Sequence, residues 1–247
     1  MKQQRSNQQG TRTKRQGATL RISEIYSSLQ GEGLLTGMDS VFVRTSGCNL
    51  RCWFCDTPFA SWDPEGDYYS IDQVLAQVAA CRTGHVVLTG GEPFIFANLY
   101  ELCDGLHAAG EHITIETAGT LYQSLRCDLI SISPKLSGSA PDAASHENWH
   151  RLHHQRRQRL DVVRQLMLDH PYQLKFVVDN AQDAQEVLVY LDELGDYCSD
   201  RVLLMPQGTQ QVELERQAEW LMPWCQQHGL RFCPRAHIAW YGNRRGT

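Results

Sequence analysis

The sequence has no apolar run long enough to cross a membrane. No window of the 247 residues approaches 18 uninterrupted apolar residues, whereas a membrane-spanning helix takes about 20. The N-terminal stretch MKQQRSNQQGTRTKRQG is polar and lacks the apolar segment of a secretory signal. We therefore expect no membrane partner, no secretion and a cytoplasmic location.

Acidic residues are absent from positions 1–17, which carry five lysines and arginines. The whole chain has 23 basic and 28 acidic residues, so 18 basic residues stand against 28 acidic ones beyond that stretch. An acidic surface of this kind argues against nucleic acid as a partner. We expect residues 1–17 to be a disordered basic extension and residues 18–247 to form one domain.

Apolar segments of strand character alternate with segments of helical periodicity. After a possible short strand beginning at Leu20, six strands are expected within residues 40–47, 85–93, 112–120, 128–136, 172–179 and 201–208. Helices are expected at 70–81 with Ser70 as N-cap, from Leu99 to a stop at Gly110, and at 147–168, 181–194 and 212–227. This alternation predicts an α/β fold with a parallel sheet.

Polar or glycine-rich loops directly follow five of these strands. They read TSGC, TGGEP, ETAGT, SPK and MPQG. Functional residues of parallel α/β sheets gather at the carboxyl ends of the strands, so these loops are expected to face one cavity. The alternative is that they are only turns, because glycine and proline end any strand.

Cysteine occurs nine times, and without a signal peptide the thiols are expected to be reduced. Six are scattered singly and are interpreted as small buried apolar residues: Cys81, Cys103, Cys127, Cys198, Cys225 and Cys233. Cys48, Cys52 and Cys55 instead follow the spacing C-x3-C-x2-C. Thiolates suit zinc or iron–sulfur clusters, but zinc would want a fourth ligand and no second C-x2-C pair exists. Three thiolates on a 4Fe–4S cluster leave one iron open, which a reactive site needs.

The cysteine spacing, with Phe54 before the last cysteine and TGGEP at 89–93, resembles the radical S-adenosylmethionine (SAM) superfamily. The resemblance implies a partial (β/α)6 barrel. It also implies that SAM binds the open iron and that one electron from the cluster cleaves SAM to a 5′-deoxyadenosyl radical, which abstracts a substrate hydrogen. The glycines of TGGEP are explained by close approach of backbone to ligand.

Further stretches are similar to one member family, the 7-carboxy-7-deazaguanine synthases of queuosine (7-deazapurine) biosynthesis. They are LQGEG, FVRTSGC, WFCDTP, IETAGT, SPKLSGSAP, LKFVV and the terminal WYGNRRGT. The resemblance implies a carbon–nitrogen lyase that converts 6-carboxy-5,6,7,8-tetrahydropterin to 7-carboxy-7-deazaguanine with loss of ammonia, by a radical ring contraction. SAM would be regenerated and Mg²⁺ required, and a homodimer is expected.

The resemblance also implies roles for single residues. Cys48, Cys52 and Cys55 would hold the cluster; Phe54, Cys55, Asp56, Gly91, Ser133, Pro134 and Lys135 would contact SAM; Leu29, Gln30, Gly31, Arg44 and Thr89 would contact substrate; Thr57 would be a Mg²⁺ ligand. Arg44 is assigned to the substrate carboxylate, which a planar guanidinium suits. Glu116 is expected to face the SAM site. The alternatives are a surface arginine at 44, a simple turn at 29–31 and a surface lysine at 135.

The segment HENWHRLHHQRRQRL at 146–160 is rich in histidine and arginine. His146, His150 and His154 are spaced for one helix face and could bind a metal, although a solvated basic helix is favoured. A third hypothesis is that its arginines dock an acidic flavodoxin that delivers the electron.

Three other functions are weighed beside the synthase. A glycyl-radical-enzyme activase shares the cysteine spacing but takes a protein substrate, whereas LQGEG, Arg44 and SPK favour a small carboxylated one. An iron–sulfur electron carrier needs neither an open iron nor a TGGEP loop. A zinc-binding interaction module lacks its fourth ligand.

Overall fold

The computed structural model describes residues 17–247. The predicted N-terminal extension therefore lies outside the described residues, apart from Gly17. The described chain is built around one nine-stranded sheet with the order β3-β1-β2-β4-β5-β6-β7-β8-β9. The strands are β1 Thr19–Leu29, β2 Asp39–Thr45, β3 Asp67–Ser70, β4 His85–Gly90, β5 His112–Thr117, β6 Leu129–Ile132, β7 Tyr172–Val178, β8 Val202–Pro206 and β9 Arg231–Phe232. Strands β2 and β4 to β9 are parallel, while at one edge β1 pairs antiparallel with β2 and β3 pairs antiparallel with β1.

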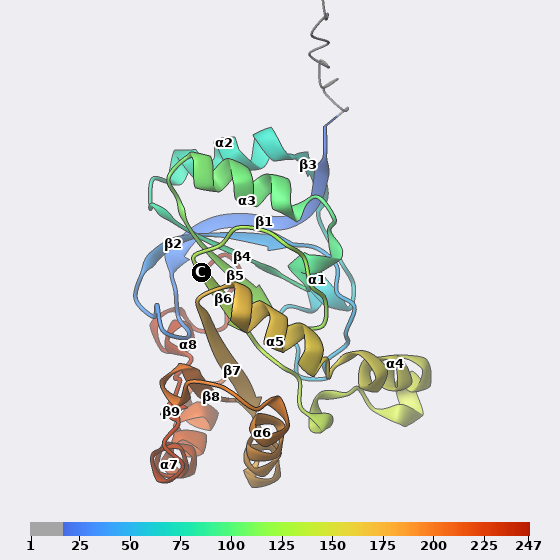
Figure 1. The fold of residues 1–247 in the computed structure, drawn as a ribbon, viewed down its shortest axis with the longest axis vertical. Helices are drawn as coiled ribbons and strands as arrows, with labels where there is room; N and C mark the ends of the chain where they lie inside the picture. The colour runs from blue at the N-terminus through green and yellow to red at the C-terminus, as the bar shows by residue number, and fades with distance from the viewer. Residues whose placement is uncertain (1–16) are drawn as a thin grey trace, which may run out of the picture.

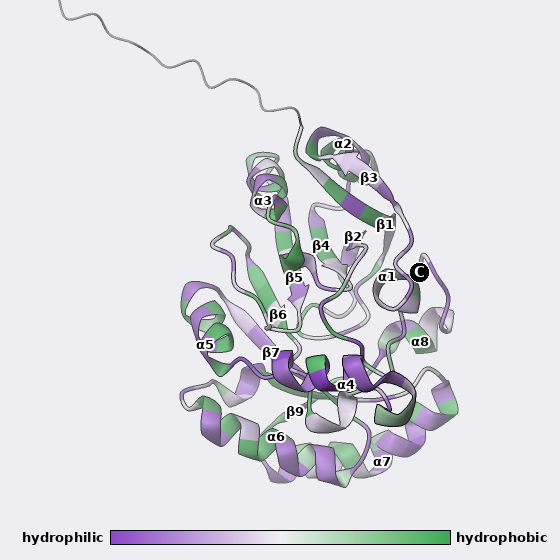
Figure 2. Cartoon of the chain, turned by 90° about the vertical axis from the view of Figure 1, so that its right-hand side faces the viewer, coloured by the Kyte–Doolittle hydropathy of each residue, from purple (hydrophilic) through white to green (hydrophobic). Residues whose placement is uncertain are grey.

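The larger helices lie along the outside of this curved sheet (Figure 1). The helices are α1 Pro58–Ser61, α2 Ile71–Cys81, α3 Leu99–Ala108, α4 Ala143–Arg156, α5 Leu160–Asp169, α6 Ala181–Leu194, α7 Gln211–Gln227 and α8 Ala236–Tyr241, with 3-10 turns at Pro93–Ile95, Ser137–Ser139 and Ser199–Arg201. Figure 2 shows hydrophilic segments on the outer faces of α6 and α7, as expected for amphipathic helices covering a sheet. No helix in the described part of the chain is long and apolar enough to span a membrane.

The six predicted parallel strands are confirmed as β2 and β4 to β8, and they form the predicted partial barrel. Their central residues are almost all buried, as in a parallel sheet covered on its faces. The predicted N-cap is also confirmed, because the Ser70 hydroxyl accepts a hydrogen bond from the Gln73 backbone and the Gln73 side-chain oxygen accepts one from the Ser70 backbone.

The single helix predicted over 147–168 is wrong. The chain forms α4 and α5 instead, because Arg159 has a non-helical backbone (φ −133°, ψ 74°). The two helices also bury different kinds of surface: α5 buries Val162, Val163 and Leu166, whereas the buried residue of α4 is His153. The first strand is long rather than short, and the exposed β3 and two-residue β9 were not predicted.

Candidate active site

A cavity of about 520 Å³ opens at the carboxyl ends of the parallel strands. All five predicted loops contribute to its lining, which confirms that they share one site. The LQGEG segment after β1, residues of β7 and α8, and residues 243–247 complete the wall. A cavity of this size at this edge of an α/β sheet is typical of a small-molecule site.

The three clustered cysteines lie in the loop after β2 and line this cavity. The Cys48 Sγ accepts a hydrogen bond from the Leu50 backbone at 3.4 Å, and the Cys55 Sγ lies 3.1 Å from the Ser61 hydroxyl. Burial raises the pKa of both Cys48 and Cys52 to about 12. All nine cysteines are free thiols, and the expected burial of the six scattered ones holds for Cys103, Cys225 and Cys233 but is wrong for Cys198, which is exposed. In residues 17–247, no three His, Cys, Asp or Glu side chains are grouped around a single ion position.

Helix α4 and the turn before it cover the outer side of the cysteine loop. The Arg51 backbone donates to His153 Nδ1 at 3.2 Å, and the Arg51 guanidinium lies 4.0 Å over the Trp149 ring. The Trp53 indole donates to the Gly138 carbonyl at 2.8 Å. Figure 1 shows α4 standing away from the sheet, so its described contacts serve the loop that carries the cysteines.

Glycines of TGGEP bring two stretches of backbone together. A Cβ at Gly91 would lie 2.1 Å from the Gly47 carbonyl oxygen, and one at Gly90 would lie 2.3 Å from the Thr45 carbonyl oxygen. The Gly90 φ of 142° is also a conformation that side chains rarely adopt. Close approach to the cysteine loop is therefore sufficient reason for these glycines, in addition to the predicted approach to a ligand.

Glu92 holds the loop after β4 in place through hydrogen bonds made by its buried side chain. Its carboxylate is fully buried and accepts hydrogen bonds from the Phe94 and Ala118 backbones and from the Thr117 hydroxyl. Burial raises the pKa of Glu92 despite these three donors. The loop after β4 is thus tied to the end of β5, which sets the position of Gly91 in the cavity.

Arg44 lies on β2 with its guanidinium in the cavity wall. Its Nε donates to Glu24 at 2.7 Å and its Nη2 donates to the Tyr26 hydroxyl at 2.9 Å. The Tyr26 ring is stacked on Phe42, with ring centres 5.2 Å apart. Two of the donor positions of Arg44 are therefore fixed by β1, and the guanidinium is held in one plane. The alternative of a surface arginine is wrong, since the side chain is only 14% exposed.

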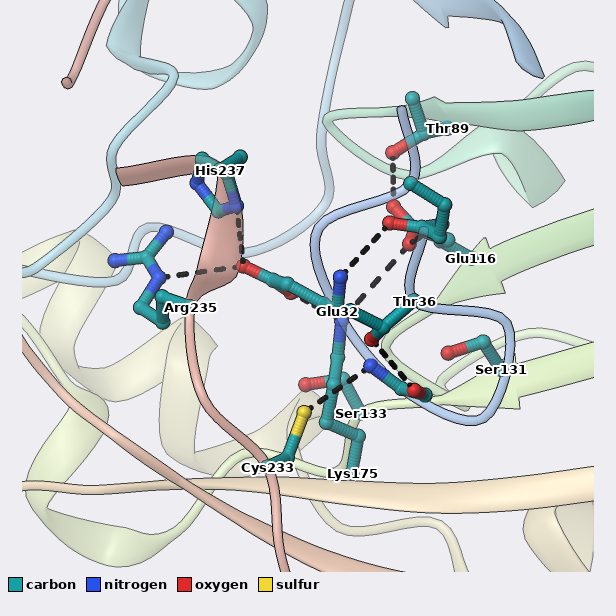
Figure 3. A network of polar contacts seen from close by, with 12 residues as sticks. Glu32, Thr36, Thr89, Glu116, Ser131, Ser133, Lys175, Cys233, Arg235 and His237 are labelled. Carbon is teal, nitrogen blue, oxygen red and sulfur yellow. Dashed lines mark hydrogen bonds and ion pairs between the residues drawn. The ribbon is translucent and has the colours of Figure 1, made fainter. Parts of the chain in front are cut away.

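A buried ionic network lies opposite, around Glu32 of the LQGEG segment (Figure 3). Glu32 forms ion pairs with Lys175 and Arg235, and His237 Nδ1 lies 3.8 Å from it. Burial alone would raise the pKa of Glu32, but Lys175 and Arg235 hold it well below its usual range. Arg235 also bonds Asp56 of the cysteine loop and the Gly208 carbonyl. One guanidinium thus joins three loops of the site.

Glu116 stands between this network and β4. It accepts hydrogen bonds from Thr89 at 2.8 Å and from the Gln30 amide at 3.4 Å, and Lys175 lies 3.9 Å away. Figure 3 shows Glu116 pointing toward Thr89. Two predicted substrate residues, Gln30 and Thr89, are therefore joined through Glu116.

Comparison with known proteins agrees with this architecture. Residues 42–166 match the model of the radical SAM superfamily. A 7-carboxy-7-deazaguanine synthase from Rhodopirellula baltica is 49% identical over 93% of this chain and 90% of its own length, and one from Halobacterium salinarum is 41% identical over 94% of each chain.

The chain belongs to the 7-carboxy-7-deazaguanine synthase family. Solved structures show the same fold. QueE from Escherichia coli superposes with a TM-score of 0.66 at 23% identity, covering 89% of this chain and 95% of that one. Streptococcus suis SuiB gives a TM-score of 0.52 at 16% identity, covering 76% of this chain and 47% of that one. The predicted radical SAM enzyme with a partial barrel is therefore confirmed.

Membership of a radical SAM family implies a 4Fe–4S cluster and SAM, and the residues present fit both. Three free thiols from one loop open into the cavity, and partial burial raises the pKa of two of them, so a thiolate there needs a compensating positive centre. Cys48, Cys52 and Cys55 would hold the cluster. Gly91 and Lys135 line the same cavity, and SAM would bind there beside the thiols.

The structure brings nearly all the predicted site residues to this one cavity. Its lining contains Leu29, Gln30, Gly31, Arg44, Cys48, Cys52, Phe54, Cys55, Asp56, Thr57, Thr89, Gly91, Glu116, Ser133 and Lys135. Pro134 is the exception, because it is buried behind the wall. Lys135 is not a free surface residue, since its ammonium donates to the Ser133 carbonyl and hydroxyl.

Sequence reasoning missed the charges that complete the site. Lys175, Arg235, His237 and residues 243–247 line the cavity without having been predicted there. Lys175 carried a signal, because it is a charged residue within the apolar strand LKFVV. His237 packs on Gly31, where a Cβ would lie 2.5 Å from the histidine, so glycine at 31 permits the approach of α8.

Proposed function

We propose that the chain catalyses the formation of 7-carboxy-7-deazaguanine from 6-carboxy-5,6,7,8-tetrahydropterin with loss of ammonia. This is a carbon–nitrogen lyase reaction that proceeds by radical ring contraction. One observation supports the proposal most directly: the cysteine triad and a largely buried Arg44, whose guanidinium is fixed by Glu24 and Tyr26, line the same cavity of about 520 Å³. The first would hold the radical-generating centre and the second would bind a small carboxylated substrate.

The residues of the cavity suit a flat, polar, anionic substrate. Arg44 would pair with its carboxylate, because Glu24 and Tyr26 already fix the guanidinium. Gln30, Thr89 and the carboxylates around them offer both donors and acceptors for the edge of a pterin. Leu29 and Gly31 would flank the ring in the same segment.

SAM, when bound beside the reduced cluster, would supply the radical that removes a substrate hydrogen. The chain's part is to hold SAM and to keep water away. Phe54, Asp56, Gly91, Ser133 and Lys135 would form its site, because all five line the cavity next to the cysteines. Pro134 would act only by shaping the loop between Ser133 and Lys135.

Mg²⁺ would bind at Thr57. The hydroxyl lies 3.7 Å from Cys55 Sγ, and Thr57 lines the cavity. Mg²⁺ prefers oxygen ligands and commonly keeps few protein ligands, so substrate oxygens and water would complete its shell.

The electron would arrive through α4 from an acidic flavodoxin. This helix covers the cysteine loop, and residues 151–159 carry four of the 18 basic residues of an otherwise acidic domain. Arg156 bonds the Asn49 carbonyl and Arg157 pairs with Glu186, whereas Arg151 is exposed.

Arg151→Glu is therefore the cleanest test of this docking site. It should slow flavodoxin-driven turnover at low salt and leave dithionite-driven turnover unchanged, with exposed Arg126→Glu on another face as the control. Equal rates with flavodoxin would reject this docking site.

The reaction is tested with anaerobically reconstituted protein, reductant, SAM, Mg²⁺ and the carboxytetrahydropterin. Mass spectrometry should detect the deazaguanine, with SAM regenerated. SAM cleavage without product would point to the activase, and a brown protein that cannot cleave SAM would point to an electron carrier. Light scattering would test the proposed homodimer, and fractionation of the source cells would test the proposed cytoplasmic location.

A further inference from the structure

The last five residues, 243–247, run along the cavity wall and are here called the C-terminal strap. Figure 2 shows the C-terminus beside α1. Arg245 fastens the strap: it donates to Glu24 at 3.1 Å and to Glu65 at 2.8 Å. Its guanidinium also lies 4.0 Å over the Phe59 ring. The strap is therefore tied both to β1 and to the segment that follows the cysteines.

Glu24 is shared between two arginines. One of its carboxylate oxygens accepts from Arg44 at 2.7 Å and the other accepts from Arg245 at 3.1 Å. The Glu24 side chain is 13% exposed and that of Arg44 is 14% exposed, so this contact is sheltered from water. The strap thus reaches the proposed substrate arginine through a single carboxylate.

This arrangement sets the charge that an incoming anion meets. Glu24 and Arg44 alone would form a neutral pair, and a substrate carboxylate at Arg44 would be repelled by Glu24. Arg245 adds a second positive charge beside Glu24, which offsets the repulsion between Glu24 and a substrate carboxylate. Glu65 pairs with Arg245 from the solvent side, where both side chains are exposed (58% and 45%) and their interaction is screened by water.

We propose that Arg245 of the C-terminal strap acts through Glu24 to hold Arg44 ready for an anionic substrate. The proposal rests on the proposed function, which assigns the substrate carboxylate to Arg44. Glu24 and Arg245 are positioning residues in this account, since neither has to touch the substrate. A strap that only closed the cavity would favour all pterins equally.

Binding of two redox-inert ligands separates these roles. 6-Carboxypterin carries the carboxylate and pterin lacks it, and both can be titrated calorimetrically into the anaerobic holoenzyme with SAM present. Arg245→Ala should weaken 6-carboxypterin binding about tenfold while changing pterin binding less than twofold. Arg245→Lys keeps the positive charge but lacks the planar guanidinium, so the affinity for 6-carboxypterin should fall about threefold. The matched control is Arg216→Ala, an exposed arginine on α7 outside the cavity lining, which should move the ratio of the two affinities less than twofold.

A double-mutant cycle tests the route through Glu24. If Arg245 acts through this carboxylate, Arg245→Ala should add little to the loss of 6-carboxypterin affinity in a Glu24→Gln background. Equal losses for both ligands, or an undiminished effect in that background, would overturn the inference and leave the proposed function standing. Failure of the wild-type holoenzyme to bind either pterin would overturn the proposed function, and this inference with it.

Discussion

The cavity has two walls of different construction. The cysteine wall, built from the loops after β2 and β4, is joined by backbone contacts between neighbouring strand ends, such as Gly91 to Thr45 and Glu92 to Gly47. The C-terminal wall, residues 231–247, begins with β9 paired to β8 and has a backbone hydrogen bond from Ala236 to Gly31, but side-chain ion pairs make its further connections across the site. Arg235 reaches Glu32 across 203 residues of sequence.

The two walls should respond differently to substitutions. Backbone contacts between adjacent parallel strands depend on the sheet and on small residues at the crossing points. Buried ion pairs depend on both partners, because removal of one leaves an uncompensated charge in a low-dielectric site. The cysteine wall should therefore tolerate changes in its polar side chains, whereas the C-terminal wall should be sensitive to single charges.

The largest effect is expected where the cysteine wall carries the chemistry. Cys52→Ala removes one of three thiols, so the reconstituted protein should lose its iron–sulfur absorbance and all SAM cleavage. Cys198→Ala is the matched control, because Cys198 is exposed and far from the cysteine loop in the chain. Retention of a stable cluster by Cys52→Ala would refute the ligand set.

Arg235→Met breaks the centre of the C-terminal wall. It leaves Glu32 and Asp56 without a shared cation, and the free energy of unfolding should fall by about 3–5 kcal/mol in urea titrations. Arg231→Met, on the same segment but exposed, should change it by less than about 0.5 kcal/mol. A loss below about 1 kcal/mol at Arg235 would show that this wall is no more sensitive than the other.

The same contrast explains which parts of the site could be predicted from the sequence. The cysteine wall is encoded locally: C-x3-C-x2-C and TGGEP each follow a strand, and parallel strand ends meet at one edge. The C-terminal wall is made by pairs such as Arg245–Glu24, which are 221 residues apart and belong to no local pattern. The motif match of WYGNRRGT marked the segment as part of the family without indicating what Arg245 contacts.

The fold likewise has elements that can be predicted from the sequence and elements that cannot. The helices 181–194 and 212–227 were predicted to within one residue, because each has an apolar stripe and a glycine shortly after its end. The break at Arg159 was missed, since no glycine or proline marks it. Helix α4 faces the cysteine loop rather than the core, and periodicity of apolar residues cannot reveal packing of that kind.

On the α4 side of the cysteine wall, His153 makes a titratable contact. Its contribution to stability can be tested by varying the pH. His153 accepts from the Arg51 backbone at Nδ1 and lies 2.9 Å from the Ser139 hydroxyl at Nε2. Burial, with neighbouring His154, lowers the pKa of His153 to about 4, below the ordinary value of 6.5. As pH falls below 6.5 the unfolded chain takes up the proton first, so stability should fall between pH 6.5 and 4.

At pH 5 this loss should amount to about 2 kcal/mol from His153, measured by urea unfolding against pH 7. His153→Asn keeps an acceptor near the position of Nδ1 and does not titrate. Its loss of stability between pH 7 and pH 5 should therefore be smaller than that of wild type by about 2 kcal/mol. His107→Asn, at an exposed position on α3, should retain the wild-type slope. Identical slopes for wild type and His153→Asn would rule out this contact as the source.

The smallest effect is expected at Thr57, in the cysteine wall. Thr57 precedes α1, yet its hydroxyl makes no capping hydrogen bond to the helix, so Thr57→Ala should leave stability within about 0.5 kcal/mol of wild type. If the hydroxyl serves Mg²⁺ instead, the Mg²⁺ concentration for half-maximal turnover should rise about tenfold. Thr57→Ser restores the oxygen and should restore the wild-type requirement. An unchanged Mg²⁺ requirement in Thr57→Ala would place the ion elsewhere in the cavity, and a loss of stability without a change in Mg²⁺ response would make Thr57 a structural residue of this wall.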